Sequence, residues 1–393
     1  MNDWLTLFFV LISSSFLLHF LPKNTLNNSS QSSQTSQSFQ STLFNHMNKG
    51  KKGENLIISP LSIFQVLSLA ANGAKEKTQT EMLDLLQCDN IDDLNKINYE
   101  ILSIFKEFST IDIANAVMTK FTPLKEFTDV AEKYLAPIEP LVSVEQVNEW
   151  CSNKTHGKID KILDELDPYT RMILLNAVYF KGEWVSKFKS TQTKKLKFYN
   201  LGTEEKDVDT MIQISHFKYY EDKKVQAIEL FFIEDDMSAI IILPAEGTDI
   251  NKYIDTLSIS NSEYNKIIEG LKRAKVHLQL PKFELEFKEK LNQALKDLGM
   301  YNAFSEIDAD FTGLREEGQL FINQVLHKTY LKVFEDGCEA AAVTAIDVAT
   351  NSLPIEEKIY DMKINRPFLF LLKNSKLPTG YDLVFMSKIE KLE

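Results

Sequence analysis

The segment from Glu335 to Pro354 places the tightest limit on what this chain can fold into. Read from Cys338 to Ala349 with the two-residue period of a β-strand, one face carries only uncharged side chains, and the other carries both acidic ones. The uncharged face holds Cys338, Ala340, Ala342, Thr344, Ile346 and Val348, and the opposite face holds Glu339, Ala341, Val343, Ala345, Asp347 and Ala349. No proline occurs from Glu335 to Leu353, so each backbone N–H of this segment can join a ladder. The pattern predicts a strand with one face on a core.

The composition of this segment leaves a second interpretation open. Four alanines within six residues favour a helix, and alanine is depleted in strands. An ordinary exposed helix or loop is therefore also compatible with the residues. The small side chains of the first half favour a strand that can slide between existing strands without large clashes. Gly337, just before the run, indicates a hinge.

The rest of the chain predicts a mixed fold. Helices cluster early, and strands cluster late and interleave, which indicates the α+β class in one large domain. The predicted helices are 39–47, 60–71, 78–87, 91–108 and 146–163. The predicted strands are 172–180, 227–232, 238–243, 275–280, 283–287, 368–372 and 383–386.

Charge and cysteine content exclude some classes of protein. The 56 acidic and 44 basic residues give a net charge of -12, which argues against a general nucleic-acid binder. Three cysteines are too few for a disulfide scaffold and allow one bridge at most. They are Cys88, Cys151 and Cys338.

The N-terminus predicts a secreted or surface-anchored protein. Residues 4–21 are apolar apart from a few hydroxyl side chains and one histidine, which is typical of a signal peptide spanning 1–22. The run is also just long enough to remain as an uncleaved membrane anchor. Residues 23–38 are rich in Ser, Gln and Asn and predict a flexible spacer before a single domain over 39–393. Asn27, Asn28 and Asn153 begin N-x-S/T sequons, which are either glycan acceptors or chance matches.

The motifs that carry enzymatic chemistry are missing from the sequence. It has no G-x-S-x-G, no Gly-rich phosphate loop, no H-E-x-x-H and no C-x-x-C. The six histidines are scattered singly, and no Cys and His pair has metal-ligand spacing. We therefore expect no enzymatic activity, no metal and no cofactor.

Eight short motifs, in order from about Phe39 to Ile389, resemble landmarks of the serpin family. Each is weak alone, but their shared order over some 350 residues is specific. The motifs are Asn55–Ser62 (NLIISPLS), Ala114–Ala116 (ANA), Val147–Ile159 (VNEWCSNKTHGKI), Leu175–Trp184 (LNAVYFKGEW), Leu280–Phe283 (LPKF), Asp310–Gly313 (DFTG), His327–Lys328 (HK) and Asn365–Leu369 (NRPFL).

This resemblance implies a serpin fold with three β-sheets, about nine helices and an exposed reactive loop at about 335–358. It also implies inhibition of a serine protease, in which the cleaved loop inserts into the main sheet as a new strand. Two alternatives stay open: a non-inhibitory serpin that acts as a chaperone or ligand carrier, and a cross-class inhibitor of a cysteine protease.

Family roles transfer to the matching positions of this sequence. The family hinge corresponds to Glu335, Gly337, Cys338, Glu339, Ala340, Ala341, Ala342 and Thr344, with Cys338 where the family usually has Thr or Ser. A buried polar cluster under the main sheet corresponds to Ser59, Ser62, Asn176 and His327, and Trp184 corresponds to a tryptophan at the top of that sheet. Because cysteine is small and uncharged, we expect insertion to survive its presence.

Family spacing places the scissile bond at Asn351–Ser352, with Thr350 and Leu353 as neighbours. The region after Ser352 is about five residues longer than in many relatives, so the cut can lie elsewhere. No arginine lies between residues 335 and 354, which favours a chymotrypsin- or elastase-like target over a trypsin-like one. Asn351 itself suits an asparagine-specific cysteine protease.

Partners other than a protease are not expected. The stretch that binds heparin in some relatives corresponds to 92–108, where Lys96 and Lys106 face four acidic residues. We therefore expect no tight heparin binding, with the lysine clusters at 49–52 and 194–197 as the alternative sites. We expect a monomer that binds no nucleic acid.

Overall fold

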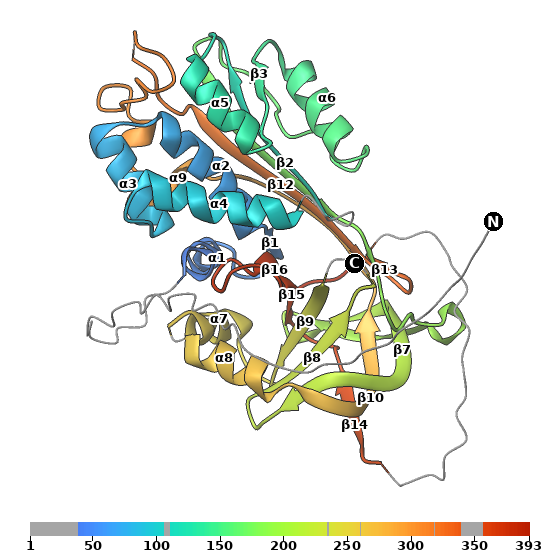
Figure 1. The fold of residues 1–393 in the computed structure, drawn as a ribbon. Helices are drawn as coiled ribbons and strands as arrows, with labels where there is room; N and C mark the ends of the chain where they lie inside the picture. Colours follow the sequence, from blue (N-terminus) through green and yellow to red (C-terminus); the bar gives the residue numbers. More distant parts are fainter. Residues whose placement is uncertain (1–37, 106–110, 234–235, 260, 318, 339–356) are drawn as a thin grey trace, which may run out of the picture. The chain divides into compact units, whose positions relative to one another are not determined.

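A five-stranded sheet, in the order β11-β12-β4-β2-β3, lies at the centre of the domain (Figure 1). Every residue of β4 (Met172–Phe180, MILLNAVYF) is buried. One face of β4 belongs to the main hydrophobic core, and the other belongs to a smaller core shared with α6 (Val144–Lys154). A continuous apolar strand is expected where both faces of a sheet are covered. The other strands are β2 (Ile111–Thr119), β3 (Ile138–Pro140), β11 (Phe283–Lys290) and β12 (Gln324–Val333).

The computed structural model describes residues 38–105, 111–233, 236–259, 261–317, 319–338 and 357–393. Contacts divide the chain into Met1–Thr35 and Ser36–Glu393. The predicted signal or anchor, nearly all of the spacer, Asn27 and Asn28 lie outside the described residues. In the described part of the chain, no helix combines the length and the apolar character needed to cross a bilayer.

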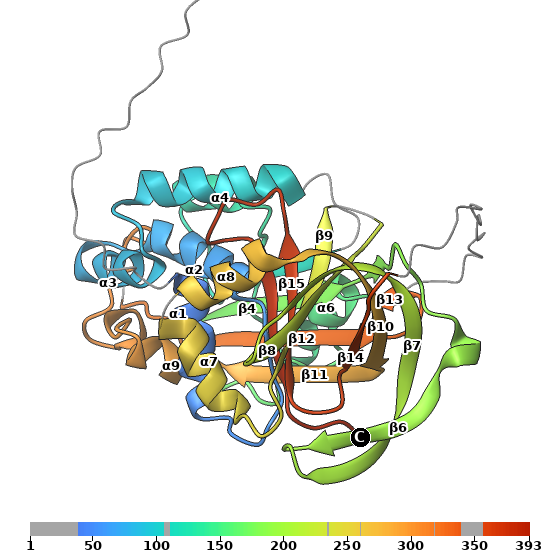
Figure 2. The same cartoon turned by 90° about the horizontal axis from the view of Figure 1, so that it is seen from below.

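A nine-stranded sheet, in the order β1-β16-β15-β9-β8-β7-β10-β14, packs with the helices of the main core, and β6 pairs with β7 (Figure 2). Its strands are β1 (Leu56–Ile58), β6 (Lys194–Asn200), β7 (Glu204–Glu221), β8 (Val225–Phe231), β9 (Met237–Pro244), β10 (Lys272–Pro281), β14 (Ile359–Lys363), β15 (Phe368–Asn374) and β16 (Leu383–Ile389). A third sheet joins β5 (Gly182–Glu183) to β13 (Gly337–Cys338).

Helix α2 (Pro60–Gly73) lies between the two larger sheets, since it contacts β2 and β4 on one side and β16 on the other. Ser59 caps its N-terminus by accepting a hydrogen bond from the Ser62 N–H, and Pro60 suits the first helical position. The other α-helices of the described chain are α1 (Phe39–Lys49), α3 (Glu76–Leu86), α4 (Ile91–Phe105), α5 (Lys125–Lys133), α7 (Ile250–Ile259), α8 (Asn261–Gly270) and α9 (Asn292–Asp297), besides two short 3-10 turns, Ser190–Gln192 and Asn302–Phe304.

The α+β class, the three sheets and the helix count are confirmed for the described chain. One predicted helix, 146–163, is too long, because α6 ends at Lys154. Thr155 turns its hydroxyl back to the Cys151 carbonyl, and His156 and Gly157 take positive φ angles of 52° and 73°, which end the helix.

Strands β2, β7 and β12 were missing from the sequence prediction. β7 spans 18 residues, but its first half is charged and pairs mainly with β6, so it shows no apolar alternation. β12 is buried on both faces and contains His327 and Lys328, which break the apolar run. The predicted strand 172–180 agrees with β4 at both ends.

Candidate functional site

A tight turn at Phe334–Gly337 reverses the chain at the end of β12. The Phe334 N–H donates to the Gly337 carbonyl at 2.9 Å, and the Gly337 N–H donates to the Phe334 carbonyl at 3.2 Å. Gly337 has a φ of +153°, and a Cβ there would lie 1.9 Å from the Gly182 carbonyl oxygen. Only glycine fits this close approach of two backbones. Its place at the predicted hinge therefore has a steric reason.

Side chains from the neighbouring strands hold the turn in place. The indole N–H of Trp184 donates to the Phe334 carbonyl at 3.0 Å, and the Trp184 ring stacks on Phe232 with centroids 4.3 Å apart. Glu335 accepts hydrogen bonds from the Thr193 hydroxyl (2.6 Å) and the Lys282 ammonium. Burial raises the pKa of Glu335, but these bonds outweigh it and hold the pKa below its usual value. Sequence reasoning found Trp184 but missed Thr193 and Lys282.

Cys338 is fully buried and faces the main core. This is the side to which the period-two pattern assigned it. All three cysteines are free and buried, so no disulfide forms among them. Burial raises the pKa of the Cys338 thiol, which keeps it protonated and apolar. The other hinge residues from Glu339 to Thr344, and Thr350, Asn351, Ser352 and Leu353, lie outside the described residues.

The four polar residues predicted to cluster do come together under the central sheet, at the junction of β4, β12 and α2. Asn176 on β4 stands opposite His327 on β12 in the parallel register. His327 Nδ1 hydrogen-bonds to Asn176 Oδ1, and the Ser59 backbone N–H donates to His327 Nε2 at 3.2 Å. The Asn176 amide also donates to the Ser62 hydroxyl. The cluster therefore bridges the two strands and the start of α2.

Asn115 on β2 is a fifth member of this polar cluster. Its Oδ1 accepts from the Asn176 amide at 2.5 Å and from the Ser62 hydroxyl at 3.3 Å. The A-N-A motif was the sequence signal that could have identified it, whereas its position opposite Asn176 follows only from the pairing of β2 with β4. With Asn115 included, the amide nitrogen of Asn176 has an acceptor for each of its two hydrogens.

The hydrogen bonds fix the protonation state of His327. A backbone N–H can only donate, so Nε2 must be the unprotonated acceptor and Nδ1 must carry the proton. Burial lowers the pKa of His327 from its ordinary 6.5 to about 3. A proton added at Nε2 would meet the Ser59 N–H, so the cluster holds the neutral imidazole.

This burial predicts acid sensitivity. Between about pH 6.5 and pH 3, His327 is protonated in the unfolded chain but stays neutral in the native state. The native state should lose up to about 1.4 kcal/mol of stability per pH unit from this group. Urea unfolding at pH 7.5, 6.5 and 5.5 measures the slope. His327→Gln should flatten it, whereas His156→Gln, at an exposed site, should not; equal slopes in both variants would contradict the assignment.

The predicted glycosylation site at Asn153 lies on the surface of the domain, apart from the polar cluster and the turn. Asn153 lies exposed in the last turn of α6, where a glycan would meet solvent. Thr155 of the same sequon is buried and hydrogen-bonded to the helix end, so it also has a structural role. Among the described residues, no three His, Cys, Asp or Glu side chains are grouped as metal ligands.

Comparisons with known proteins agree with this fold. The family model described as Serpin (serine protease inhibitor) matches residues 34–391. Iripin-2 of Ixodes ricinus is 32% identical over 86% of this chain and 88% of its own length. Leukocyte elastase inhibitor of Xenopus laevis is 31% identical over 84% and 92%, respectively.

A solved structure gives the same result for the fold. The native state of the thermophilic serpin tengpin matches with a TM-score of 0.80 and 32% identity, over 90% of this chain and 92% of that chain. The family model covers the whole chain except residues 1–33 and the last two residues. The chain therefore belongs to the serpin family of serine protease inhibitors.

Proposed function

We propose that this serpin traps a serine protease as a suicide substrate. The protease serine Oγ attacks the carbonyl carbon of the residue at the scissile bond, for which family spacing favours Asn351. The bond to Ser352 breaks, the Ser352 amine leaves with a proton, and the new end of the loop stays esterified to the protease. Insertion of the loop before water hydrolyses this ester traps the enzyme.

The observation that carries the proposal is the direction in which the chain runs in the strands around the turn. β12 and β4 are parallel neighbours, and the Phe334–Gly337 turn reverses the chain at the end of β12. A strand continuing from this turn runs antiparallel to β12, and therefore also to β4. It can bond to both strands if they part, with no change of direction and no crossover.

The register of the turn supports the predicted faces of the loop. Continuing the ladder from the Phe334–Gly337 bridge places Ala342 opposite Thr329 and Thr344 opposite His327. Thr329 and His327 are on the face of β12 that also carries Leu331 and Val333 of the main core. The uncharged face of the loop would thus meet the core and the polar cluster. The face with Glu339 and Asp347 would meet the α6 side.

A chymotrypsin- or elastase-like enzyme is the proposed target class. The loop segment 335–354 contains no arginine, and Leu353 suits such enzymes. The relative named leukocyte elastase inhibitor supports the same choice. An asparagine-specific cysteine protease is the cross-class alternative, since Asn351 would then direct the cut.

A covalent complex is the direct test of this function. The full chain is mixed with chymotrypsin, elastase, trypsin and an asparagine-specific protease, and the products are run on a denaturing gel. A band at the summed mass with chymotrypsin or elastase supports the proposal. Cleavage of the loop by every enzyme without such a band would contradict it. Mass spectrometry of the released peptide gives the scissile bond.

Secretion accompanies this proposal, since an inhibitor of extracellular proteases must leave the cell. It is supported by the apolar run at 4–21, with anchoring at the cell surface as the alternative. N-terminal sequencing of the protein from its native host distinguishes the two. A start near residue 23 supports cleavage, and an intact Met1 in the membrane fraction supports anchoring.

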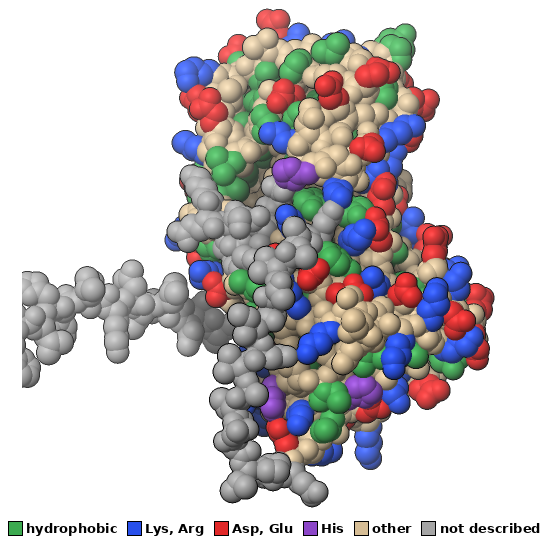
Figure 3. All heavy atoms as spheres, turned by 90° about the vertical axis from the view of Figure 1, so that its right-hand side faces the viewer, with side chains coloured by type: hydrophobic (Ala, Val, Ile, Leu, Met, Phe, Trp, Pro, Cys, Tyr) green, Lys and Arg blue, Asp and Glu red, His purple; other side chains and the backbone are tan. Residues whose placement is uncertain are grey.

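Heparin should not accelerate inhibition. On the face that Figure 3 shows, Lys and Arg side chains are interspersed with Asp and Glu. In the two lysine clusters, Lys51, Lys52 and Lys197 form ion pairs with carboxylates at 2.9, 3.6 and 3.1 Å. We expect less than about a twofold change in the inhibition rate at physiological salt. A tenfold rise, abolished by charge reversal at Lys194 and Lys195, would contradict this expectation.

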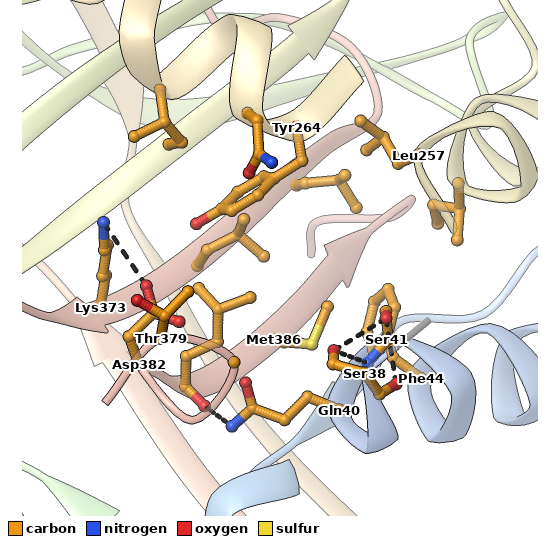
Figure 4. A pocket seen from close by; sticks show the side chains of 17 residues that line it. Ser38, Gln40, Ser41, Phe44, Leu257, Tyr264, Lys373, Thr379, Asp382 and Met386 are labelled. Carbon is orange, nitrogen blue, oxygen red and sulfur yellow. Dashed lines mark hydrogen bonds and ion pairs between the residues drawn. The ribbon is translucent and has the colours of Figure 1, made fainter. Parts of the chain in front are cut away.

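A cavity supports small-molecule carriage as a second candidate function. It measures about 280 Å³ and lies between α1, α7, α8 and the strands β15 and β16 (Figure 4). The Tyr264 hydroxyl is buried and, within the described chain, has no hydrogen-bond partner. Lys373 and Asp382, which also line the cavity, form an ion pair. A small amphipathic molecule could accept a bond from Tyr264.

A fluorescent amphipathic probe such as anilinonaphthalene sulfonate tests this cavity. One-to-one binding that Leu257→Arg abolishes, with the fold intact, would support carriage. Equal probe binding by the Leu257→Arg variant, or none by the parent protein, would contradict it.

A further inference from the structure

Three exposed hydrophobic side chains form a patch next to the hinge. Val185, Phe231 and Ile233 are 64%, 41% and 58% exposed. They flank the antiparallel bridge between Trp184 and Phe232, whose rings point into the core. Because side chains alternate along paired strands, the residues on either side of this bridge must point outward. The fold therefore holds these three side chains in solvent.

This patch reaches both ends of the loop segment. On one side, Glu183 pairs with Gly337 at the start of the hinge, directly beside Val185 and Ile233. On the other side, Val185 and Phe231 share a cavity of about 290 Å³ with His216. His216 Nε2 lies 2.9 Å from a carboxylate oxygen of Glu357, the first described residue after the loop. The patch thus occupies the surface between the two points where the loop leaves and rejoins the domain.

Positive charge borders the hydrophobic patch. Arg273 lines the same cavity, is exposed, and forms no ion pair with any side chain of the described chain. Lys218 lies over the Phe231 ring, 4.9 Å from its centroid, and its charge is compensated by Glu229 at 3.1 Å. The acidic Glu183 is itself paired with Lys187. The border therefore offers an uncompensated guanidinium beside apolar side chains.

We propose that this patch is a second docking surface for the target protease, outside the protease's active-site cleft. The inference rests on the proposed function, because a protease that grips the loop between its two ends must face the surface between them. The matching surface of the protease would carry an apolar side chain for the cavity and a carboxylate for Arg273. Exposed apolar side chains rimmed by polar ones are typical of such interfaces.

The rate of encounter tests this surface separately from trapping. Arg273→Glu and Ile233→Ser are compared with the parent protein, using the protease that the parent traps most quickly. Each should lower the second-order inhibition rate constant about tenfold, with unchanged stoichiometry and covalent complex. The loss from Arg273→Glu should shrink in high salt, since exposed charges are then screened, whereas the loss from Ile233→Ser should not.

Two exposed substitutions elsewhere serve as controls. Lys96→Glu on α4 matches the charge change, and Ile307→Ser, at a side chain that is 80% exposed, matches the apolar loss. Both should leave the rate unchanged. Rates for Arg273→Glu and Ile233→Ser equal to these controls would overturn the docking surface while the proposed function stands. Absence of any covalent complex with the parent protein would overturn the proposed function, and this site with it.

Discussion

Cleavage of the loop between Asn351 and Pro354 is expected to raise the melting temperature by about 10–15 °C. Insertion breaks one parallel pairing of β12 with β4, over seven residue pairs, and makes two antiparallel ladders in its place. About a dozen additional hydrogen bonds at roughly 1 kcal/mol each amount to about 10 kcal/mol. In a domain of this length, each kcal/mol corresponds to slightly more than 1 °C.

Differential scanning calorimetry of intact and nicked protein measures the change. A protease that nicks the loop without being trapped gives the cleaved form, and mass spectrometry verifies a single cut. Protein cut only in the spacer at 23–38 is the matched control and should melt with the intact form. A nicked form that melts at or below the temperature of the intact protein would rule out insertion.

The sequence predicted the central sheet best where burial on both faces left a continuous apolar run. MILLNAVYF was assigned to the residues that form β4, because nothing polar interrupts it except Asn176. The same rule failed for β12, where His327, Lys328 and Thr329 interrupt the run although all three are buried. Their burial depends on partners in other elements, such as the carbonyls of Ile57 and Lys161, which one strand's sequence cannot reveal.

The sequence predicted those residues of the candidate site to which the family resemblance assigns a role. It missed the residues that only tertiary contacts bring to the site. Ser59, Ser62, Asn176 and His327 were named from the resemblance, and they do meet. Asn115 was passed over as a cluster member, because only the pairing of β2 with β4 brings it to Asn176. Thr193 and Lys282 reach Glu335 from positions 142 and 53 residues away, so no local pattern marks them.

Gly337 shows a third kind of case. A glycine was expected at this position because it begins the hinge, but the structure adds a second reason for glycine, the close packing of two backbones. Sequence inspection suggests freedom of φ at a glycine, and the φ of +153° uses it, but the chain also approaches the Gly182 carbonyl too closely for any Cβ. Gly337→Ala should therefore disturb the pairing of β13 with β5 before it affects the motion of the loop.

Ala342→Arg is expected to convert the inhibitor into a substrate. The turn register places residue 342 opposite Thr329, on the face of β12 that packs on the main core. An unpaired charge buried there costs about 3–5 kcal/mol, which slows insertion roughly 10²–10⁴-fold. Hydrolysis of the ester should then outrun insertion. The protease should emerge active, the covalent band should vanish, and each enzyme molecule should consume many inhibitors.

Glu339→Arg is the matched control, since it also places an arginine in the hinge. The same register puts residue 339 opposite Lys332, whose side chain is 39% exposed on the outer face of the sheet. A charge at that position stays in contact with water, so trapping should persist with nearly unchanged stoichiometry. The contrast between two arginines three residues apart depends only on which face of the inserted strand each occupies. If Glu339→Arg lost inhibition and Ala342→Arg kept it, the register set by the Phe334–Gly337 turn would not be that of the inserted strand.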